Sequence, residues 1–454
     1  MRVQDDTIVA IATPIGEGGI SVIRLSGPEA VKVADKGFRG KCPLVSVATH
    51  TAHFGRFTNS QGHVIDEVVA TVFKQPQSYT GEDVVEVSCH GGIYLTSAVL
   101  NELINYGART AEPGEFTKRA FLNGRLDLTR AEAVMELIRA RSEAGARAAL
   151  ARLRGGLQER IEGLRRRCLN ALAHIEAGID FGDEGIEFLP RAEAIETLGG
   201  VRAELDRLIG QSLQGRLLQD GAQVAIVGRP NVGKSSLLNR LLDSDRAIVS
   251  PLPGTTRDTL EEYTVIDGIP LRLIDTAGLR PSDDPIERAG IERTRAVLER
   301  AEVVLVVLEA GTAVSPDETD WLRGPAPRLA VVNKVDQTPP DQTVAGLPEG
   351  TGWVAVSALR GDGMTDLRRN LRRAVLGAGD DLEGVLVARI RHRNALCEAR
   401  EHLHQALESL QIGLSEEVVA MDLRASIGPL GEVLGLTVTD ELLDTIFREF
   451  CIGK

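Results

Sequence analysis

The stretch Gly228-Arg-Pro-Asn-Val-Gly-Lys-Ser235 decides the fold of the central part of this chain. It fits the pattern G-x-x-x-x-G-K-[ST] and follows an apolar run, 223–228, that predicts a buried strand, and a helix is predicted from Leu237 onward. Such a loop lets backbone N–H groups surround phosphate oxygens, while Lys234 adds positive charge and the Ser235 hydroxyl can bind Mg²⁺. These residues predict a nucleoside triphosphate site.

Further motifs follow apolar runs in chain order. Asp275-Thr-Ala-Gly278 can offer a carboxylate to the Mg²⁺ shell and an amide to the γ-phosphate. Asn333-Lys-Val-Asp336 carries a carboxylate that can accept both N–H groups of a guanine edge, which adenine lacks. Ser357-Ala-Leu359 can present a backbone amide to the guanine carbonyl. Because a doubly wound sheet binds its ligand at the strand ends, the motifs together predict a GTPase.

Bulk properties limit the alternatives. A length of 454 residues predicts two to four domains, and a net charge of −13 argues against nonspecific coating of nucleic acid. The 5 cysteines are scattered without a C-x-x-C pair, so neither a zinc site nor a disulfide framework is expected. The sequence shows no export signal and no long apolar run, which predicts a cytoplasmic protein with no membrane contact.

The chain divides by pattern into several parts. Residues 1–118 contain β-rich runs at 7–13, 20–25, 68–73 and 83–88, and a helical stretch from Gly91 to Tyr106. Residues 119–217 and 380–454 are helical, with Leu128, Ala131, Val134, Met135 and Ile138 on one face. Residues 218–376 alternate strand and helix. The expected fold is therefore multidomain α/β plus α, with a Ras-like P-loop GTPase domain inserted into a discontinuous helical domain.

These residues resemble a known family. The loop 228–236, Gly254-Thr-Thr-Arg-Asp258, Asp275-Thr-Ala-Gly-Leu-Arg280 and Cys451-Ile-Gly-Lys454 are similar to the MnmE (TrmE) family of tRNA modification GTPases. The likeness extends to Thr13-Pro, Gly81-Glu-Asp83 and Pro113-Gly-Glu-Phe116. It implies that residues 1–118 form a folate-binding-like and dimerisation domain.

The resemblance also implies an activity. Such proteins work with an FAD-dependent MnmG/GidA partner, in a heterotetramer or larger assembly, to place a carboxymethylaminomethyl or aminomethyl group at C5 of tRNA uridine 34. The carbon comes from 5-formyltetrahydrofolate or methylenetetrahydrofolate. The family's GTPase is a homodimer and is activated by K⁺.

The motifs and the resemblance together give a set of expected site residues. Those expected to bind GTP are Asn231, Val232, Gly233, Lys234, Ser235, Ser236, Ser250, Pro251, Leu252, Pro253, Gly254, Thr255, Thr256, Asp275, Thr276, Ala277, Gly278, Asn333, Lys334, Asp336, Ser357, Ala358 and Leu359. The resemblance places Mg²⁺ on Ser235 and Thr256, and K⁺ on Asn231, Ser250, Leu252 and Thr255. Leu279 follows Gly278 and cannot orient water as a glutamine would, so the resemblance implies Glu287 as the catalytic residue.

The same resemblance places folate contacts on Arg24, Glu86, Arg125 and Lys454. Arg125 departs from the family pattern, where a lysine is expected. Cys451 is a candidate modification-site thiol, although a small structural residue is the favoured interpretation. The arginines between Arg147 and Arg167 could contact tRNA phosphates, but a solvated helix face paired with glutamates is favoured.

A regulatory or ribosome-assembly GTPase, acting as a binding switch, is the alternative function. The nucleotide motifs do not distinguish it from a modification enzyme. The folate-binding-like part and the terminal Cys451-Ile-Gly-Lys454 favour modification.

Overall fold

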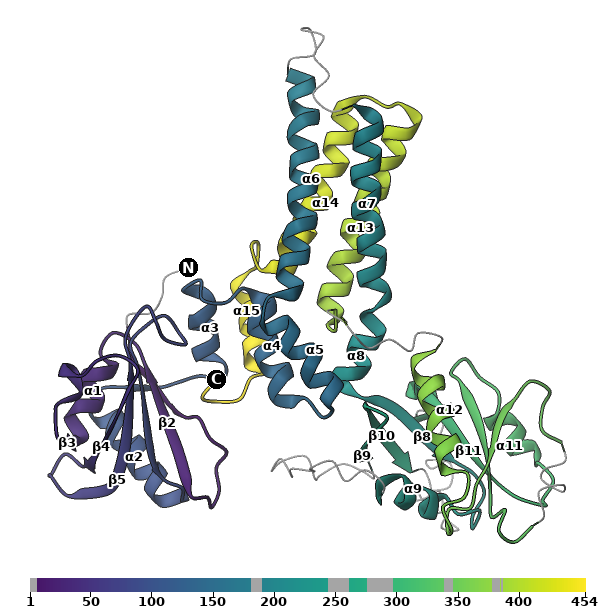
Figure 1. Cartoon of the computed structure of the whole chain (residues 1–454), viewed down its shortest axis with the longest axis horizontal. Helices are drawn as coiled ribbons and strands as arrows, with labels where there is room; N and C mark the ends of the chain where they lie inside the picture. The colour runs from purple at the N-terminus through teal and green to yellow at the C-terminus, as the bar shows by residue number, and fades with distance from the viewer. Residues whose placement is uncertain are drawn as a thin grey trace, which may run out of the picture. The chain divides into compact units, whose positions relative to one another are not determined.

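The computed structural model describes residues 6–180, 190–243, 261–275, 297–338, 346–377, 384 and 387–454. The chain forms two compact units. The first contains residues 1–135, 152–201 and 398–454, and the second contains residues 136–151 and 202–397. Figure 1 labels many of the helices and strands of each unit, with the names used below.

A seven-stranded sheet forms the N-terminal part of the first unit, in the order β3-β4-β5-β6-β2-β1-β7. Its neighbours pair antiparallel except β1 and β7, which are parallel. The strands are β1 (Ile8–Ile11), β2 (Ile20–Ser26), β3 (Phe38–Gly40), β4 (Thr51–Thr58), β5 (Val64–Phe73), β6 (Val84–His90) and β7 (Arg109–Thr110). The β-rich runs predicted from sequence are confirmed as β1, β2, β5 and β6.

Two helices cover one face of this sheet, α1 (Ala30–Gly37) and α2 (Ile93–Asn105). Buried side chains of α1 and α2, such as Val31 and Leu103, form one apolar cluster with alternate residues of the strands, such as Val68 and Val87. Since successive strand residues point to opposite faces, the other face keeps exposed side chains such as Phe54.

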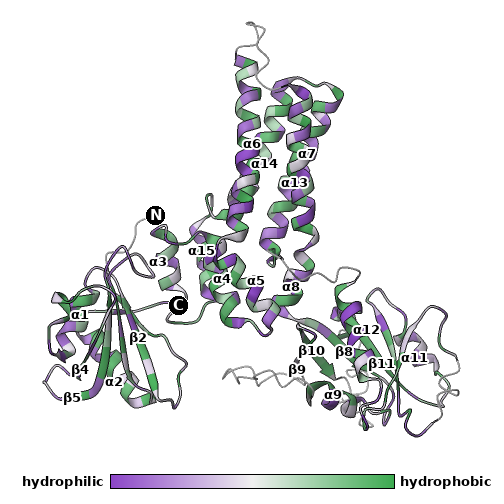
Figure 2. Cartoon of the chain, viewed as in Figure 1, coloured by the Kyte–Doolittle hydropathy of each residue, from purple (hydrophilic) through white to green (hydrophobic). Residues whose placement is uncertain are grey.

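Helices of 8 to 25 residues follow the sheet along the chain. They are α3 (Glu115–Leu122), α4 (Leu128–Arg139), α5 (Glu143–Leu153), α6 (Gly156–Asp180), α7 (Arg191–Gly210), α13 (Ile390–Ile412), α14 (Glu416–Leu434) and α15 (Asp440–Arg448). Helices α6 and α14 pack along each other. Apolar residues recur at helical spacing along both, as the hydropathy colours of Figure 2 show.

The predicted apolar face of α4 is only partly buried. Leu128, Ala131 and Met135 pack with Phe447 of α15 in one cluster. Ile138, which the same spacing placed on that face, is 47% exposed, because the cluster ends at Met135.

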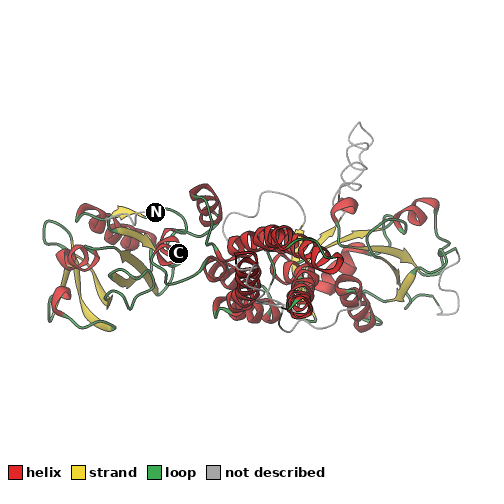
Figure 3. Ribbon diagram, turned by 90° about the horizontal axis from the view of Figure 1, so that it is seen from above, coloured by secondary structure: helices red, strands yellow, loops and turns green. Residues whose placement is uncertain are grey.

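The second unit is built on a six-stranded sheet in the order β13-β12-β11-β8-β10-β9. Its strands are β8 (Ala222–Val227), β9 (Glu261–Ile266), β10 (Ile269–Asp275), β11 (Val303–Glu309), β12 (Arg328–Asn333) and β13 (Gly352–Ala355). The helices are α8 (Ser212–Asp220), α9 (Lys234–Asp243), α11 (Pro316–Trp321) and α12 (Met364–Leu376). Figure 3 distinguishes these strands and helices by colour.

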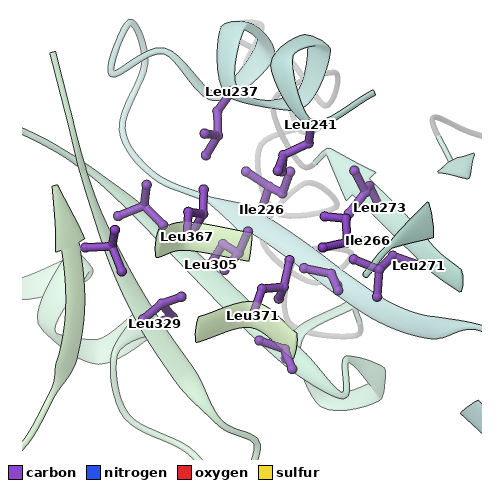
Figure 4. Packing of buried hydrophobic residues seen from close by; sticks show 14 of the residues in the cluster. Ile226, Leu237, Leu241, Ile266, Leu271, Leu273, Leu305, Leu329, Leu367 and Leu371 are labelled. Carbon is purple, nitrogen blue, oxygen red and sulfur yellow. The ribbon is translucent and has the colours of Figure 1, made fainter. Parts of the chain in front are cut away.

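Apolar clusters bury both faces of this sheet. Ile226 packs with Leu237 and Leu241 of α9 and Leu371 of α12 on one face, as Figure 4 shows. Val227 belongs to the cluster on the other face. Burial on both faces explains why central parallel strands such as β8 and β11 are nearly continuous apolar runs.

One strand differs from the parallel pattern that the sequence predicts. β9 pairs antiparallel with β10 through a tight turn at Asp267 and Gly268, whose φ angles are 48° and 83°. An Asp-Gly pair with both φ positive is the usual signal of a two-residue hairpin. The hairpin could therefore have been found from the sequence, although β9 itself carries no apolar run.

Candidate nucleotide site and candidate folate site

The glycine-rich loop joins β8 to α9, in a backbone shape that requires two of its glycines. Gly228 has φ 155°, and a Cβ there would lie 2.4 Å from the Val307 carbonyl oxygen. Gly233 has φ 97°, and a Cβ there would lie 2.2 Å from Asn333 Nδ2. Only glycine fits both positions without strain. The helix begins at Lys234, one turn earlier than predicted, so the polar residues of the motif form its first turn.

Lys234 is held inside this loop. Its side chain is buried, and Nζ donates hydrogen bonds of 2.7 Å to the carbonyl oxygens of Gly228 and Arg229. The ammonium group therefore lies beside the N-terminus of α9, where the helix dipole also favours an anion. Ser235 and Ser236 are exposed on the same first turn.

A buried carboxylate anchors the loop from behind. Glu318 of α11 is 0% exposed and accepts a 2.7 Å hydrogen bond from Nε of Arg229. It also accepts hydrogen bonds of 2.9 Å from the backbone N–H and the hydroxyl of Ser315 in a capping box. Arg229, the first variable residue of the loop, is thereby fixed to the N-terminal end of α11. Sequence reasoning missed this anchor, although Ser315-x-x-Glu318 is a recognisable capping signal.

The motifs expected to recognise the base meet at the loop. Asn333, at the end of β12, donates from Nδ2 to the Val232 carbonyl oxygen at 2.8 Å and accepts from the Ala358 N–H at 3.0 Å. One buried side chain thus joins the phosphate loop to the segment 357–359. Lys334 has φ 66°, and its Nζ pairs with Glu309 Oε1 at 2.8 Å.

Asp336 is oriented by its neighbour. The hydroxyl of Ser357 donates to Asp336 Oδ1 at 2.7 Å, and this hydrogen bond lowers the pKa of the carboxyl group below its usual value. The group is therefore a carboxylate at neutral pH, which can only accept hydrogen bonds. A guanine edge with two N–H donors suits such a group.

Several expected residues lie outside the part of the chain that the structure describes. They are Ser250, Pro251, Leu252, Pro253, Gly254, Thr255, Thr256, Thr276, Ala277, Gly278, Leu279 and Glu287. The backbone of Asp275 ends β10 in register with Ile226 of β8, next to the phosphate loop.

The expected folate contacts gather on the sheet of the first unit. Arg24 of β2 lies directly across from Glu86 of β6, with Nη2 and Oε1 2.8 Å apart. Arg24 Nη1 also donates to the Gly453 carbonyl oxygen at 3.1 Å. The structure thus brings Arg24 and Glu86 to the terminal segment although 429 positions separate Arg24 from Gly453.

Lys454 is half-buried in this cluster. Burial and the charge of Arg24 lower the pKa of its amino group, while Glu86 and Cys451 act in the opposite direction. The backbone N–H of Phe116 donates to the Lys454 carbonyl oxygen at 3.2 Å. The Lys454 backbone is therefore held at α3, its amino group lies near enough to Arg24 and Glu86 to feel their charges, and Cys451 is exposed.

Two aromatic side chains that the sequence analysis did not single out complete this cluster. The guanidinium carbon of Arg24 lies 5.5 Å from the ring centroid of Tyr79 and 5.8 Å from that of Phe116. Arg125 packs its side chain against Gly81, close in sequence to Tyr79. Phe116 is fully buried and Tyr79 packs against the same small apolar cluster, so the two rings support the Arg24 guanidinium from the protein side. The described residues contain no group of three or more His, Cys, Asp or Glu side chains that could hold a metal ion.

Comparison with known proteins decides the family. A family model described as the MnmE helical domain matches residues 128–451, and one described as the GTP-binding protein TrmE N-terminus matches residues 7–125. The chain belongs to the MnmE family of tRNA modification GTPases. The predicted resemblance, the multidomain fold class and the GTP hydrolase class are confirmed.

The relatives of MnmE type match along the whole chain. The tRNA modification GTPase MnmE of Symbiobacterium thermophilum is 47% identical over 458 residues, covering 99% of this chain and 100% of that protein. The MnmE of Moorella thermoacetica is also 47% identical, over 464 residues, with the same coverage. Among solved structures, Era of Aquifex aeolicus bound to GDP.AlF4- covers 47% of this chain and 89% of its own, at 24% identity and a TM-score of 0.28. Within the described residues, no helix has the length and hydropathy of a membrane span.

Proposed function

We propose that this chain couples GTP hydrolysis to modification of the wobble uridine of tRNA. The product is a carboxymethylaminomethyl or aminomethyl group at C5 of uridine 34, made in the cytoplasm with an FAD-dependent MnmG/GidA partner and a reduced-folate carbon donor. The observation that carries this proposal is the presence, in one chain, of a guanine nucleotide site and a separate Arg24–Glu86–Lys454 cluster. A GTPase that acts only as a binding switch uses the nucleotide site and has no evident use for the Arg24–Glu86–Lys454 cluster.

The nucleotide site supports GTP. Lys234 and the first N–H groups of α9 bind the phosphates, and the exposed Ser235 is placed to share Mg²⁺ with Thr256. Asp336, held by Ser357, accepts both N–H groups of guanine. The remaining expected contacts, from Ser250 to Gly278, belong to the same proposal.

Hydrolysis needs a charge and a positioned water. Leu279 has no polar group, so Glu287 orients the attacking water. A K⁺ ion on Asn231, Ser250, Leu252 and Thr255 supplies positive charge near the β- and γ-phosphates. Asn231 has φ 65° and is exposed on the loop, which suits an oxygen ligand.

Two measurements test this step. Turnover in KCl should exceed turnover in NaCl of equal ionic strength, and equal rates would remove the K⁺ site. Glu287→Ala should lower kcat on the order of 100-fold while nucleotide affinity is retained. A near-normal rate would refute the role of Glu287.

The folate proposal rests on complementary charge. Glu86 can accept from the amino and ring N–H groups of a pterin, while Arg24, Arg125 and Lys454 suit the glutamate tail. A titration with 5-formyltetrahydrofolate should show a loss of affinity in Glu86→Ala. Glu67→Ala is the matched control, since Glu67 forms an exposed pair with Arg56 on the same sheet. Equal affinity in both variants would count against the site.

The open face of the N-terminal sheet supports a homodimer. Phe54 is 67% exposed and lies across from Val69, which is 38% exposed, so two apolar side chains adjoin on neighbouring strands. A second copy of this chain is the proposed occupant. Sedimentation velocity should show dissociation in Phe54→Glu and none in Val45→Glu, an exposed apolar position outside the sheet. A dimer that persists in Phe54→Glu would place the interface elsewhere.

The cellular role is tested by mass spectrometry of wobble nucleosides. Cells that lack this protein should lose the modified uridine, and the natural chain should restore it. Lys234→Ala and Glu86→Ala should both fail to restore it, because one removes phosphate binding and the other folate binding. Unaltered modification in cells lacking the protein, with a changed ribosome profile, would instead support the ribosome-assembly alternative.

A further inference from the structure

The side chain of Arg240 connects the phosphate-binding helix to the loop that faces the base. Arg240 lies on α9, six residues after Lys234, and is half-buried. Its Nε donates to the Ala358 carbonyl oxygen at 3.1 Å and its Nη2 donates to the Leu359 carbonyl oxygen at 2.5 Å. The guanidinium group also packs 3.7 Å from the position of a Cβ on Gly361. A planar group with fixed donors thus holds two consecutive carbonyl groups.

These contacts set the direction of one particular N–H group. In a planar trans peptide, the C=O and the following N–H point in opposite directions. With the Ala358 C=O turned toward α9, the Leu359 N–H points away from α9. The Ala358 N–H is already occupied by Asn333 Oδ1, at 3.0 Å. Leu359 therefore offers the amide of this loop to a ligand, and its side chain is 76% exposed.

The same turn also orients the carboxylate of Asp336. The N–H of Arg360, which follows the carbonyl group held by Arg240, donates to Ser357 Oγ at 3.1 Å. That hydroxyl in turn donates to Asp336 Oδ1 at 2.7 Å. The turn thereby holds Asp336 through hydrogen bonds of its own, in which the Arg240 side chain takes no part.

We propose that Arg240 is a positioning residue for guanine specificity, which aims the Leu359 N–H at the base carbonyl. This inference rests on the nucleotide site proposed above. Arg240 itself touches neither base nor phosphate. Without the Arg240 side chain, the carbonyl groups of Ala358 and Leu359 are no longer held. The nucleotide then loses the hydrogen bond from the Leu359 N–H to the 6-oxo group, while the phosphate contacts remain.

The test compares the effect of the substitution on two ligands, which differ at that carbonyl and at N1, where guanine carries a hydrogen and 2-aminopurine does not. GDP carries the 6-oxo group, and 2-aminopurine riboside diphosphate lacks it. In Arg240→Met, GDP affinity should fall on the order of tenfold, the equivalent of one hydrogen bond, while affinity for the analogue changes less than about twofold. At saturating GTP, kcat should stay unchanged and KM should rise.

Two further variants complete the design. Arg240→Gln keeps one donor group and should therefore recover part of the GDP affinity. This variant replaces Arg240→Met in the comparison if the methionine variant does not fold. Arg369→Met is the matched control, because Arg369 forms an exposed pair with Asp366 on α12.

An equal loss for GDP and the analogue, or a loss in neither, would overturn the role of Arg240. If the unaltered protein binds ADP as tightly as GDP, the nucleotide site itself is wrong, whatever the Arg240 variants show.

Discussion

Replacing the Asn333 side chain should destabilise the second unit strongly, although few atoms are lost. Asn333 is 3% exposed and makes two hydrogen bonds, to the Val232 carbonyl oxygen at 2.8 Å and from the Ala358 N–H at 3.0 Å. Asn333→Ala leaves both backbone groups buried without these partners. Each such group costs about 1–3 kcal/mol, so the free energy of unfolding should fall by roughly 2–6 kcal/mol. That is a large part of the roughly 5–15 kcal/mol of a typical domain.

The assay uses the position of the tryptophans. The chain has 2 tryptophans, Trp321 and Trp353, and both lie in the second unit, on α11 and β13. Tryptophan fluorescence during urea unfolding of the nucleotide-free full chain therefore reports on this unit alone. Asn370→Ala is the control, since Asn370 makes a single exposed hydrogen bond to the Asp366 carbonyl oxygen. The reasoning is refuted if Asn333→Ala loses no more stability than Asn370→Ala.

Three other outcomes follow from the same contacts. Glu318→Ala should destabilise the second unit by roughly 2–4 kcal/mol in the same fluorescence assay, because it removes a buried carboxylate with three hydrogen bonds; a loss below about 1 kcal/mol would contradict this. Gly453→Ala should weaken folate binding, since φ is 92° and the new Cβ would lie 2.4 Å from the Ile11 carbonyl oxygen. Gly62→Ala is the control, since Gly62 has φ 83° but open space around it, and this variant should bind folate normally. Equal folate affinity in the two variants would contradict the prediction. Burial raises the pKa of Glu115, but the hydrogen bonds from Arg109 and the Glu112 N–H outweigh it, so the pKa lies below its ordinary 4.5. A depressed carboxyl pKa gives stability that is fully present above pH 4.5 and is lost as the pH falls through the lowered value. Because Arg109→Leu removes this contribution, its free energy of unfolding, followed by circular dichroism, should fall less steeply with decreasing pH than that of the natural chain.

The strand, loop and helix that carry the proposed nucleotide site could be predicted largely from sequence, and the reason is local. Gly228 to Ser235 specify strand, loop and helix within a few residues, and Asn333 and Asp336 directly follow a buried apolar run. Because the carboxyl ends of parallel strands meet at one edge of a sheet, the segments that follow them are expected to lie close together. The start of α9 was placed too late because polar residues in a first helical turn interrupt the apolar period.

Contacts between distant segments could not be predicted in this way. Arg240 and Ala358 are 118 positions apart, and the charge pattern of α9 gives no sign of the loop that the arginine holds. Tyr79 and Phe116 belong to a small apolar cluster, and nothing in their sequence pattern shows that the Arg24 side chain lies over their rings. Only the pairing of β2 with β6, together with the path of the terminal segment, brings them under Arg24.

The central claim is that Asp336 reads guanine through its carboxylate, and changing the group on that side chain tests it most directly. Asp336→Asn replaces two acceptors by one acceptor and one donor, which match the N1–H and 2-oxo groups of xanthine. Hydrolysis of GTP and xanthosine triphosphate by the full chain should show the preference inverted, with at least about tenfold loss for GTP. A variant that still hydrolyses GTP in preference to xanthosine triphosphate would contradict the site.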